Sequence, residues 1–236
     1  MAQRVNALPV GVTKVRFSFR HHVLPPLLGI VVTFLMYGLL NFPSFEAQAL
    51  YYADRFKPQP DTTATHSVAV NSSLSDVLIP SIEVKAPVIY ESSTNNADIA
   101  YDLRSGTVHY GSTALPGEKG NVVIFGHSSG LTWAPGNYKF VFTLLNKLRA
   151  GQQITLDYKG TRYVYVVSGS QVVPPTDMKV LDSNGTQSEL TLITCTPVGT
   201  STNRLAVHAV KLYPNPDTNK AFKPANSAAL NELPSN

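Results

Sequence analysis

Three residues have side chains suited to covalent chemistry on a carbonyl group: Cys195, His127 and Arg204. Cys195 is the only cysteine. It ends an apolar, β-branched run that begins at Leu190, and Pro197 follows, so we expect the thiol where a strand stops pairing. His127 follows a second run of this kind. A thiolate nucleophile needs a base or cation beside the sulfur and a donor for the oxyanion that forms during attack. The imidazole and the guanidinium can supply both.

Each of these residues also has a plainer interpretation. A lone cysteine is often a small buried hydrophobe, a lone histidine is often structural, and an arginine at the start of a strand often lies on the surface. The strand-end positions of Cys195 and His127 favour chemistry, and a β-domain that only binds partners leaves this placement unexplained. We expect another histidine, His109, to be structural.

Length and composition allow one domain with a real core and additional segments at its ends, because 43% of the 236 residues are hydrophobic. Four of the 19 basic residues lie within residues 1–45, which hold no acidic residue, so the remaining 15 match the 15 acidic residues of the chain. The basic character therefore belongs to the N-terminal arm, and no nucleic-acid partner is expected.

A stretch without charged residues, 23–45, predicts one transmembrane helix. Basic residues precede it, so we expect a single-pass protein of the cell membrane with a cytoplasmic N-terminus and an extracellular catalytic domain. The alternative is a signal peptide cleaved after Ala49, because Ala47-Gln48-Ala49 has the small-x-small form. The length of the apolar run favours a retained anchor.

The chain is predicted to have five segments: a cytoplasmic basic arm (1–22), the transmembrane anchor (23–45), an extracytoplasmic stalk (46–73), a catalytic domain (74–212) and an irregular C-terminal tail (213–236). Short β-rich runs separated by turn signals such as Lys159-Gly160 predict a barrel or sandwich for the catalytic domain. Apolar residues at three-residue spacing from Phe142 to Leu148 predict one helix within it.

The residues around the thiol and the imidazole resemble a known family. Leu192-Ile193-Thr194-Cys195 followed by Arg204, with Gly126-His127-Ser128 upstream, is similar to the sortases, which are membrane-anchored cysteine transpeptidases. Residues 108–121 and 142–154 resemble the segments that flank the sortase histidine. The resemblance implies an all-β, sortase-type eight-stranded β-barrel with one or two short helices.

The same resemblance implies roles for individual residues. Cys195 is expected to be the nucleophile, His127 the acid and base, and Arg204 a donor to the oxyanion and the substrate. The backbone N–H of Thr196 is expected to share the oxyanion. Thr194 is expected either to orient the strand end or to contact substrate.

The implied reaction is cleavage of a Leu-Pro-x-Thr-Gly-like sorting signal at the C-terminus of a secreted protein. A thioacyl intermediate then passes the acyl group to an amine of peptidoglycan or of another surface protein, such as a pilin. No cofactor is expected. The carboxylates of the sequence show no EF-hand spacing, so no obligatory metal is predicted.

Features of the motif bear on the sortase class. Thr194-Cys195-Thr196-Pro197 with Gly199 resembles classes C, D and E more than classes A and B. Class C pilin polymerases usually carry an Asp-Pro-aromatic lid before the barrel, and no such tripeptide occurs between Glu46 and Asn121. This departure favours a housekeeping or class D/E-like enzyme over a pilin-polymerising one.

A serine hydrolase is the alternative enzyme. Residues 126–130 match the G-x-S-x-G nucleophile elbow of α/β-hydrolases, with Ser128 as nucleophile and Asp177 or Asp182 and then His208 as partners. That elbow requires a helix directly after the serine and a parallel sheet from alternating βα units. Neither pattern is present in the sequence.

Overall fold

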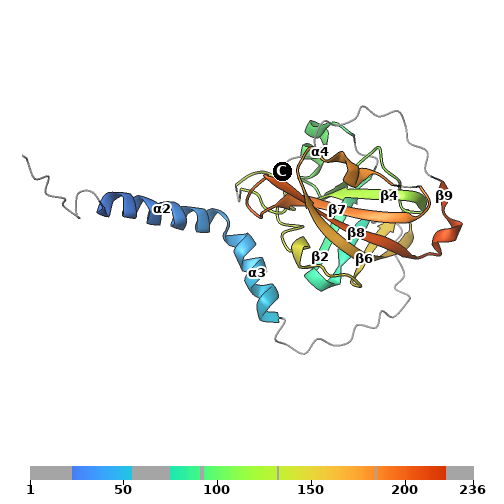
Figure 1. Ribbon diagram of the computed structural model, residues 1–236, viewed down its shortest axis with the longest axis horizontal. Coiled ribbons are helices and arrows are strands. Elements are labelled where there is room, and N and C mark those ends of the chain that lie inside the picture. Colours follow the sequence, from blue (N-terminus) through green and yellow to red (C-terminus); the bar gives the residue numbers. More distant parts are fainter. Residues whose placement is uncertain (1–22, 55–74, 91–92, 132, 184, 222–236) are drawn as a thin grey trace, which may run out of the picture. The chain divides into compact units, whose positions relative to one another are not determined.

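The computed structural model describes residues 23–54, 75–90, 93–131, 133–183 and 185–221 (Figure 1). The predicted basic arm, most of the predicted stalk and the end of the predicted tail lie outside the described residues. The chain divides into two compact units, Met1–Leu40 and Asn41–Asn236, and each has its own structure.

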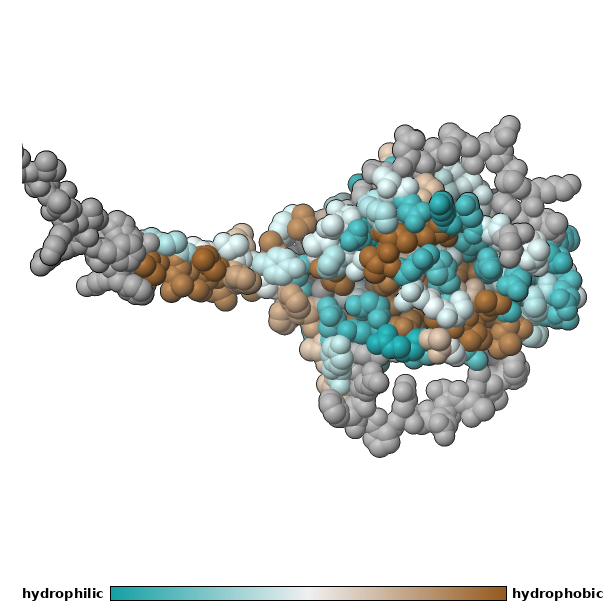
Figure 2. Space-filling view, viewed as in Figure 1, coloured by the Kyte–Doolittle hydropathy of each residue, from teal (hydrophilic) through white to brown (hydrophobic). Residues whose placement is uncertain are grey.

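Two helices, α2 (Leu24–Leu40) and α3 (Phe42–Asp54), occupy the region predicted to be one transmembrane helix. None of the α2 residues is buried, and Figure 2 shows that most of them are hydrophobic. α2 has 17 residues. No helix among the described residues is both long and apolar enough to cross a membrane. The region predicted to form one helix, 23–45, is instead divided between α2 and the start of α3.

The break in this predicted helix follows from a proline. α2 ends at Leu40, and Pro43 falls in the first turn of α3. Proline has no backbone N–H to bond the carbonyl four residues earlier, and inside a helix its ring clashes with that carbonyl, but a first turn tolerates it. The apolar run of the sequence is therefore divided at Asn41.

Eight strands of the second unit close into a β-barrel (Figure 1). Their order is β3-β2-β1-β5-β6-β8-β7-β4, and β3 also pairs with β4, which closes the barrel. The pairs β2–β3 and β4–β7 are parallel, and the other pairs of the barrel are antiparallel. The prediction of an all-β, eight-stranded barrel is confirmed. The strands are β1 (Asp76–Ile79), β2 (Val84–Ile89), β3 (Thr107–His109), β4 (Glu118–Phe125), β5 (Gln153–Tyr158), β6 (Thr161–Val173), β7 (Ser188–Thr196) and β8 (Asn203–Tyr213).

The residues of the turn explain the hairpin between β5 and β6. β5 and β6 turn at Lys159 and Gly160, as predicted, with φ of 47° and 76°. Positive φ at both central residues is the geometry of a type I′ turn, which suits the twist of the flanking strands.

The tail predicted to be irregular from 213 instead begins with the end of β8, a 3-10 helix, η4 (Pro216–Thr218), and a short strand, β9 (Lys220–Ala221), which pairs with the start of β4.

The short helices of this unit differ from the prediction. In place of a helix from Phe142 to Leu148, turns lead into the three-residue 3-10 helix η2 (Leu145–Lys147). The sequence did not predict α4 (Asn96–Asp102), which begins where the Asn95 side chain accepts a hydrogen bond from the Ala97 N–H (2.8 Å). Two further 3-10 helices are η1 (Pro80–Ile82) and η3 (Met178–Leu181).

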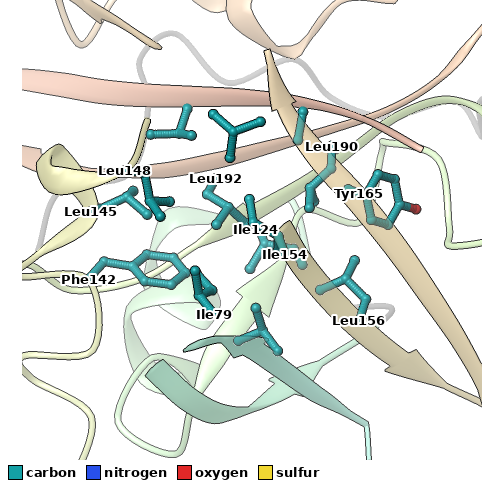
Figure 3. Close-up of a cluster of buried hydrophobic side chains, with 14 of the residues drawn as sticks. Ile79, Ile124, Phe142, Leu145, Leu148, Ile154, Leu156, Tyr165, Leu190 and Leu192 are labelled. Carbon is teal, nitrogen blue, oxygen red and sulfur yellow. The ribbon is translucent and has the colours of Figure 1, made fainter. Parts of the chain in front are cut away.

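Apolar side chains fill the barrel interior (Figure 3). Ile124 of β4 and Leu192 of β7 point into it, and the ring of Phe142 packs in the same cluster. Each of these side chains is at most 1% exposed. Residues two apart on a strand share a face, so the intervening positions of β4, β7 and β8 face outward.

A second apolar cluster covers that outer face. Phe125, Ile193 and Ala206 contribute from β4, β7 and β8. α4 covers them with two residues, Ile99 and Leu103, and η3 adds a valine. In this part of the three strands both faces are therefore buried, which explains the unbroken apolar run at the end of β4.

Candidate active site

Cys195 and Arg204 lie directly opposite each other on two antiparallel strands. β7 ends one residue after the cysteine, β8 begins one residue before the arginine, and the two residues are register partners. Directly opposed residues have Cβ atoms about 5 Å apart and share one face of the sheet. This is the outer face, because Cys195 is two residues from Ile193 and Arg204 is two residues from Ala206. Each side chain is 2% exposed.

His127 lies on the other side of β7. β4 and β7 run parallel with Phe125 beside Ile193, and the Gly126 N–H donates to the Ile193 carbonyl (3.1 Å), so the ladder continues past the end of β4. The same register brings His127 beside Cys195, on strands about 4.8 Å apart. Figure 1 shows β7 between β4 and β8. Arg204 of β8, Cys195 of β7 and His127, two residues past the end of β4, thus follow one another in a row, here named the Cys195 row.

Three hydrogen bonds fix the backbone around the imidazole. The Thr194 hydroxyl donates to the carbonyl of Gly126 (2.7 Å), and the Phe142 N–H donates to the carbonyl of His127 (2.8 Å). The Thr143 hydroxyl donates to the carbonyl of the next residue, Ser128 (2.6 Å). Three successive carbonyls are therefore held by two other segments of the chain. The Thr194 contact favours one of the two roles considered for this residue, that of orienting the strand end.

A close approach explains the glycine beside the imidazole. A Cβ atom at Gly126 would lie 2.4 Å from Cδ2 of the Phe142 ring, far inside van der Waals contact. That ring is 1% exposed and belongs to the interior cluster, so it has no room to withdraw. Only glycine allows His127 and the barrel core to pack this closely.

The turn between β7 and β8 holds the guanidinium. Arg204 Nη1 donates to the carbonyls of Ser201 (2.9 Å) and Asn203 (3.2 Å). The Gly199 N–H of the same turn donates to the Ser129 hydroxyl (3.0 Å), which ties the turn to the loop after the imidazole. Because a guanidinium is planar, fixing Nη1 also fixes the directions of its other N–H groups.

Thr196, the second residue expected to support an oxyanion, is the last residue of β7 and pairs with Asn203. It is half-buried and directly follows the thiol residue. Its backbone therefore lies at the edge of the Cys195 row. In the described part of the chain, no three His, Cys, Asp or Glu side chains gather as a group that could hold a metal ion.

The serine hydrolase alternative does not fit this geometry. The Ser128 side chain is fully buried, and the described residues from Ser129 to Leu144 contain no helix. The sheet is a mostly antiparallel barrel, and the His208 ring bonds Thr191 (3.1 Å). His109, which was expected to be structural, is 1% exposed, and its Nε2 lies 2.9 Å from the carbonyl of Ala114.

Similarity to known proteins agrees with the fold and the motifs. A family model described as "Sortase domain" matches residues 77–212. A "Sortase A" of Streptococcus agalactiae serotype III (strain NEM316) is 28% identical over 147 residues, which cover 62% of this chain and 55% of that protein. The chain therefore spans little more than half the length of this relative. A "Sortase A" of Bacillus anthracis is 26% identical over 166 residues, 69% of this chain and 72% of the relative.

Solved structures show the same likeness. Sortase C1 from Streptococcus suis superposes with a TM-score of 0.51 at 31% identity, over 60% of this chain and 73% of the other. Sortase C-1 from Actinomyces oris gives 0.51 at 26% identity, over 72% of this chain and 99% of the other. With the family model matching more than half of its residues, the chain belongs to the sortase family.

Proposed function

We propose that the chain is a cysteine transpeptidase that cuts a sorting signal on a secreted protein and joins the new end to an amine at the cell surface. The observation that carries the proposal is the Cys195 row: a thiol and a guanidinium paired on the outer face of β7 and β8, and a histidine two residues past the end of β4. Membership of the sortase family supports the same reaction class.

The reaction starts from the thiolate of Cys195 and the imidazolium of His127. The sulfur attacks the peptide carbonyl, and the tetrahedral oxyanion receives hydrogen bonds from Arg204 and the Thr196 N–H. His127 gives its proton to the leaving amine, so the C–N bond breaks and a thioester remains on Cys195. An incoming amine attacks the thioester and loses its proton to His127. A new amide forms, and the thiolate returns.

The proposed substrate is a Leu-Pro-x-Thr-Gly-like peptide, and the proposed acceptor is an amine of peptidoglycan or of a surface protein. The solved relatives of class C favour a second candidate, in which the acceptor is a pilin subunit. The missing Asp-Pro-aromatic tripeptide between Glu46 and Asn121 favours the first candidate. The two candidates share the chemistry of the Cys195 row and differ only in the acceptor.

A transfer assay tests the proposal. The protein is incubated with a quenched fluorescent Leu-Pro-Ala-Thr-Gly peptide and triglycine, and the joined product is measured by mass spectrometry. We expect Cys195→Ala to abolish both cleavage and transfer and to stay folded, because a small thiol contributes little packing. Ser128→Ala, the matched control, is expected to keep its activity. Transfer by the cysteine variant, or its loss in the serine variant, contradicts the proposal.

A further inference from the structure

A second row of polar side chains crosses the same face of the barrel. Gln171 of β6, His208 of β8, Thr191 of β7 and Asn121 of β4 lie on four adjacent strands and line a pocket of about 170 Å³. η3 and the residue after it supply another wall of this pocket. These four residues are named the polar row.

The direction of every hydrogen bond in the polar row can be derived. The Asn121 amide nitrogen donates to the carbonyls of Val180 (3.1 Å) and Leu181 (3.3 Å), which can only accept. Its oxygen therefore faces Thr191, whose hydroxyl donates to it (2.9 Å). The hydroxyl has one proton, so its 3.1 Å contact with Nδ1 of His208 must be a bond that it accepts from that nitrogen.

The donors and acceptors in the rest of the polar row follow from the proton on Nδ1 of His208. With its proton on Nδ1, neutral His208 has a lone pair on Nε2, and the Gln171 amide nitrogen donates to it (3.0 Å). A continuous series of hydrogen bonds, each donated in the same direction, thus runs from β6 across β8, β7 and β4. It ends on two backbone carbonyls of η3, a segment that belongs to the connection between β6 and β7.

The polar row and the Cys195 row are neighbours. Thr191 precedes Cys195 by four residues on β7, and His208 follows Arg204 by four on β8, so the rows are about 13 Å apart. Val180 of η3 belongs to the outer cluster together with Ile193, which lies between the two rows on β7. η3 therefore packs on the outer face that also carries the thiol.

We propose that Asn121, Thr191 and His208 are positioning residues that hold η3 against the outer face, and that η3 forms a wall against which the substrate peptide packs. The inference rests on the proposed function for its substrate. η3 spans only four residues, and its own capping bond, from the Lys179 N–H to Asp177, is 3.2 Å and exposed. The buried amide of Asn121 supplies the tether that this short helix lacks.

Thr191→Val tests the role, because valine keeps the shape and removes the hydroxyl that joins His208 to Asn121. Hydrogen–deuterium exchange of residues 177–182 is expected to become faster. KM for the quenched Leu-Pro-Ala-Thr-Gly peptide is expected to rise about three- to tenfold, with kcat unchanged, which is the size expected when one or two hydrogen bonds are lost. Thr191→Ser keeps the hydroxyl and is expected to show the wild-type exchange rate of residues 177–182 and the wild-type KM.

The matched control is Thr155→Val on β5, whose side chain makes no hydrogen bond with the described residues and lies outside both rows. It is expected to change neither exchange nor KM. Unchanged exchange in Thr191→Val overturns the positioning role, as does a fall in kcat at constant KM. If the wild-type protein cleaves no peptide, the proposed function fails, and the exchange of 177–182 still decides whether the polar row holds η3.

Discussion

The guanidinium of Arg204 is buried and fixed by the turn that leads into its strand. Two carbonyls hold Nη1, and the rigid plane then fixes the directions of the remaining N–H groups. A lysine at this position keeps the charge but has a single ammonium on a flexible stem. It cannot bond the turn and an oxyanion with the same geometry.

Arg204→Lys is therefore expected to lower kcat/KM for the quenched peptide by about 100- to 1000-fold, the usual effect of losing an oxyanion donor. The control is Arg162→Lys on β6, whose guanidinium pairs with Asp157 (2.8 Å) away from the Cys195 row. That variant is expected to keep its activity. If Arg204→Lys works at the wild-type rate, the arginine has no directional role in the reaction.

At the scale of elements, the end of β4 depends on a contact that only glycine permits. Gly126→Ala forces a methyl group onto the Phe142 ring, so we expect a loss of about 1–3 kcal/mol in the free energy of unfolding and a marked fall in kcat. Gly169→Ala on β6 is the control, because a Cβ there meets nothing within 4 Å. Urea unfolding and peptide cleavage measure the two effects. Equal behaviour of the two variants contradicts the role given to this contact.

Local sequence signals were enough to predict the barrel strands other than β3 and to place Cys195, His127 and Arg204 at strand ends. The β-branched runs, the Lys159-Gly160 turn and Pro197 each act through neighbouring residues, so no tertiary contact is needed to recognise them. The closed strand order and the pairing of Cys195 with Arg204 depend on register. Register is set by packing and by the turn between the strands.

Other features of the site depend on contacts distant in sequence. The Thr194 hydroxyl bonds a carbonyl 68 positions away, and the Asn121 amide reaches η3 about as far along the chain. The helix predicted over 142–148 is also wrong: the segment forms turns that lead into η2, and the Phe142 N–H donates to the distant His127 carbonyl. α4 has seven residues and a weak apolar period, although the cap residue Asn95 is a local signal that could have marked its start.

At the scale of the whole molecule, the stability of the barrel is expected to depend on pH through His208. Burial lowers the pKa of this histidine, and the Glu189 carboxylate raises it in part. Lys179 and Asp182 face the same pocket. Because the pKa in the folded state lies below that of the unfolded chain, about 6.5, the unfolded chain binds the proton more readily as the pH falls through this range. Acid therefore destabilises the fold at this group.

Urea unfolding at about pH 7.5 and about pH 5 measures this dependence. The wild-type protein is expected to lose more stability on acidification than His208→Gln, which has no proton to gain at this position. The carboxylates titrate in both proteins, so the comparison isolates the histidine. An equal loss in the two proteins contradicts the assigned cause.

The measurement that tests the central claim most directly is the mass of the covalent intermediate. The protein is mixed with the Leu-Pro-Ala-Thr-Gly peptide without an amine acceptor, quenched in acid and analysed by intact mass spectrometry and peptide mapping. The account predicts an adduct equal to the acyl part of the peptide, located on Cys195 and released by hydroxylamine, as a thioester is. An adduct on Ser128, or peptide cleavage with no adduct on Cys195, would contradict it.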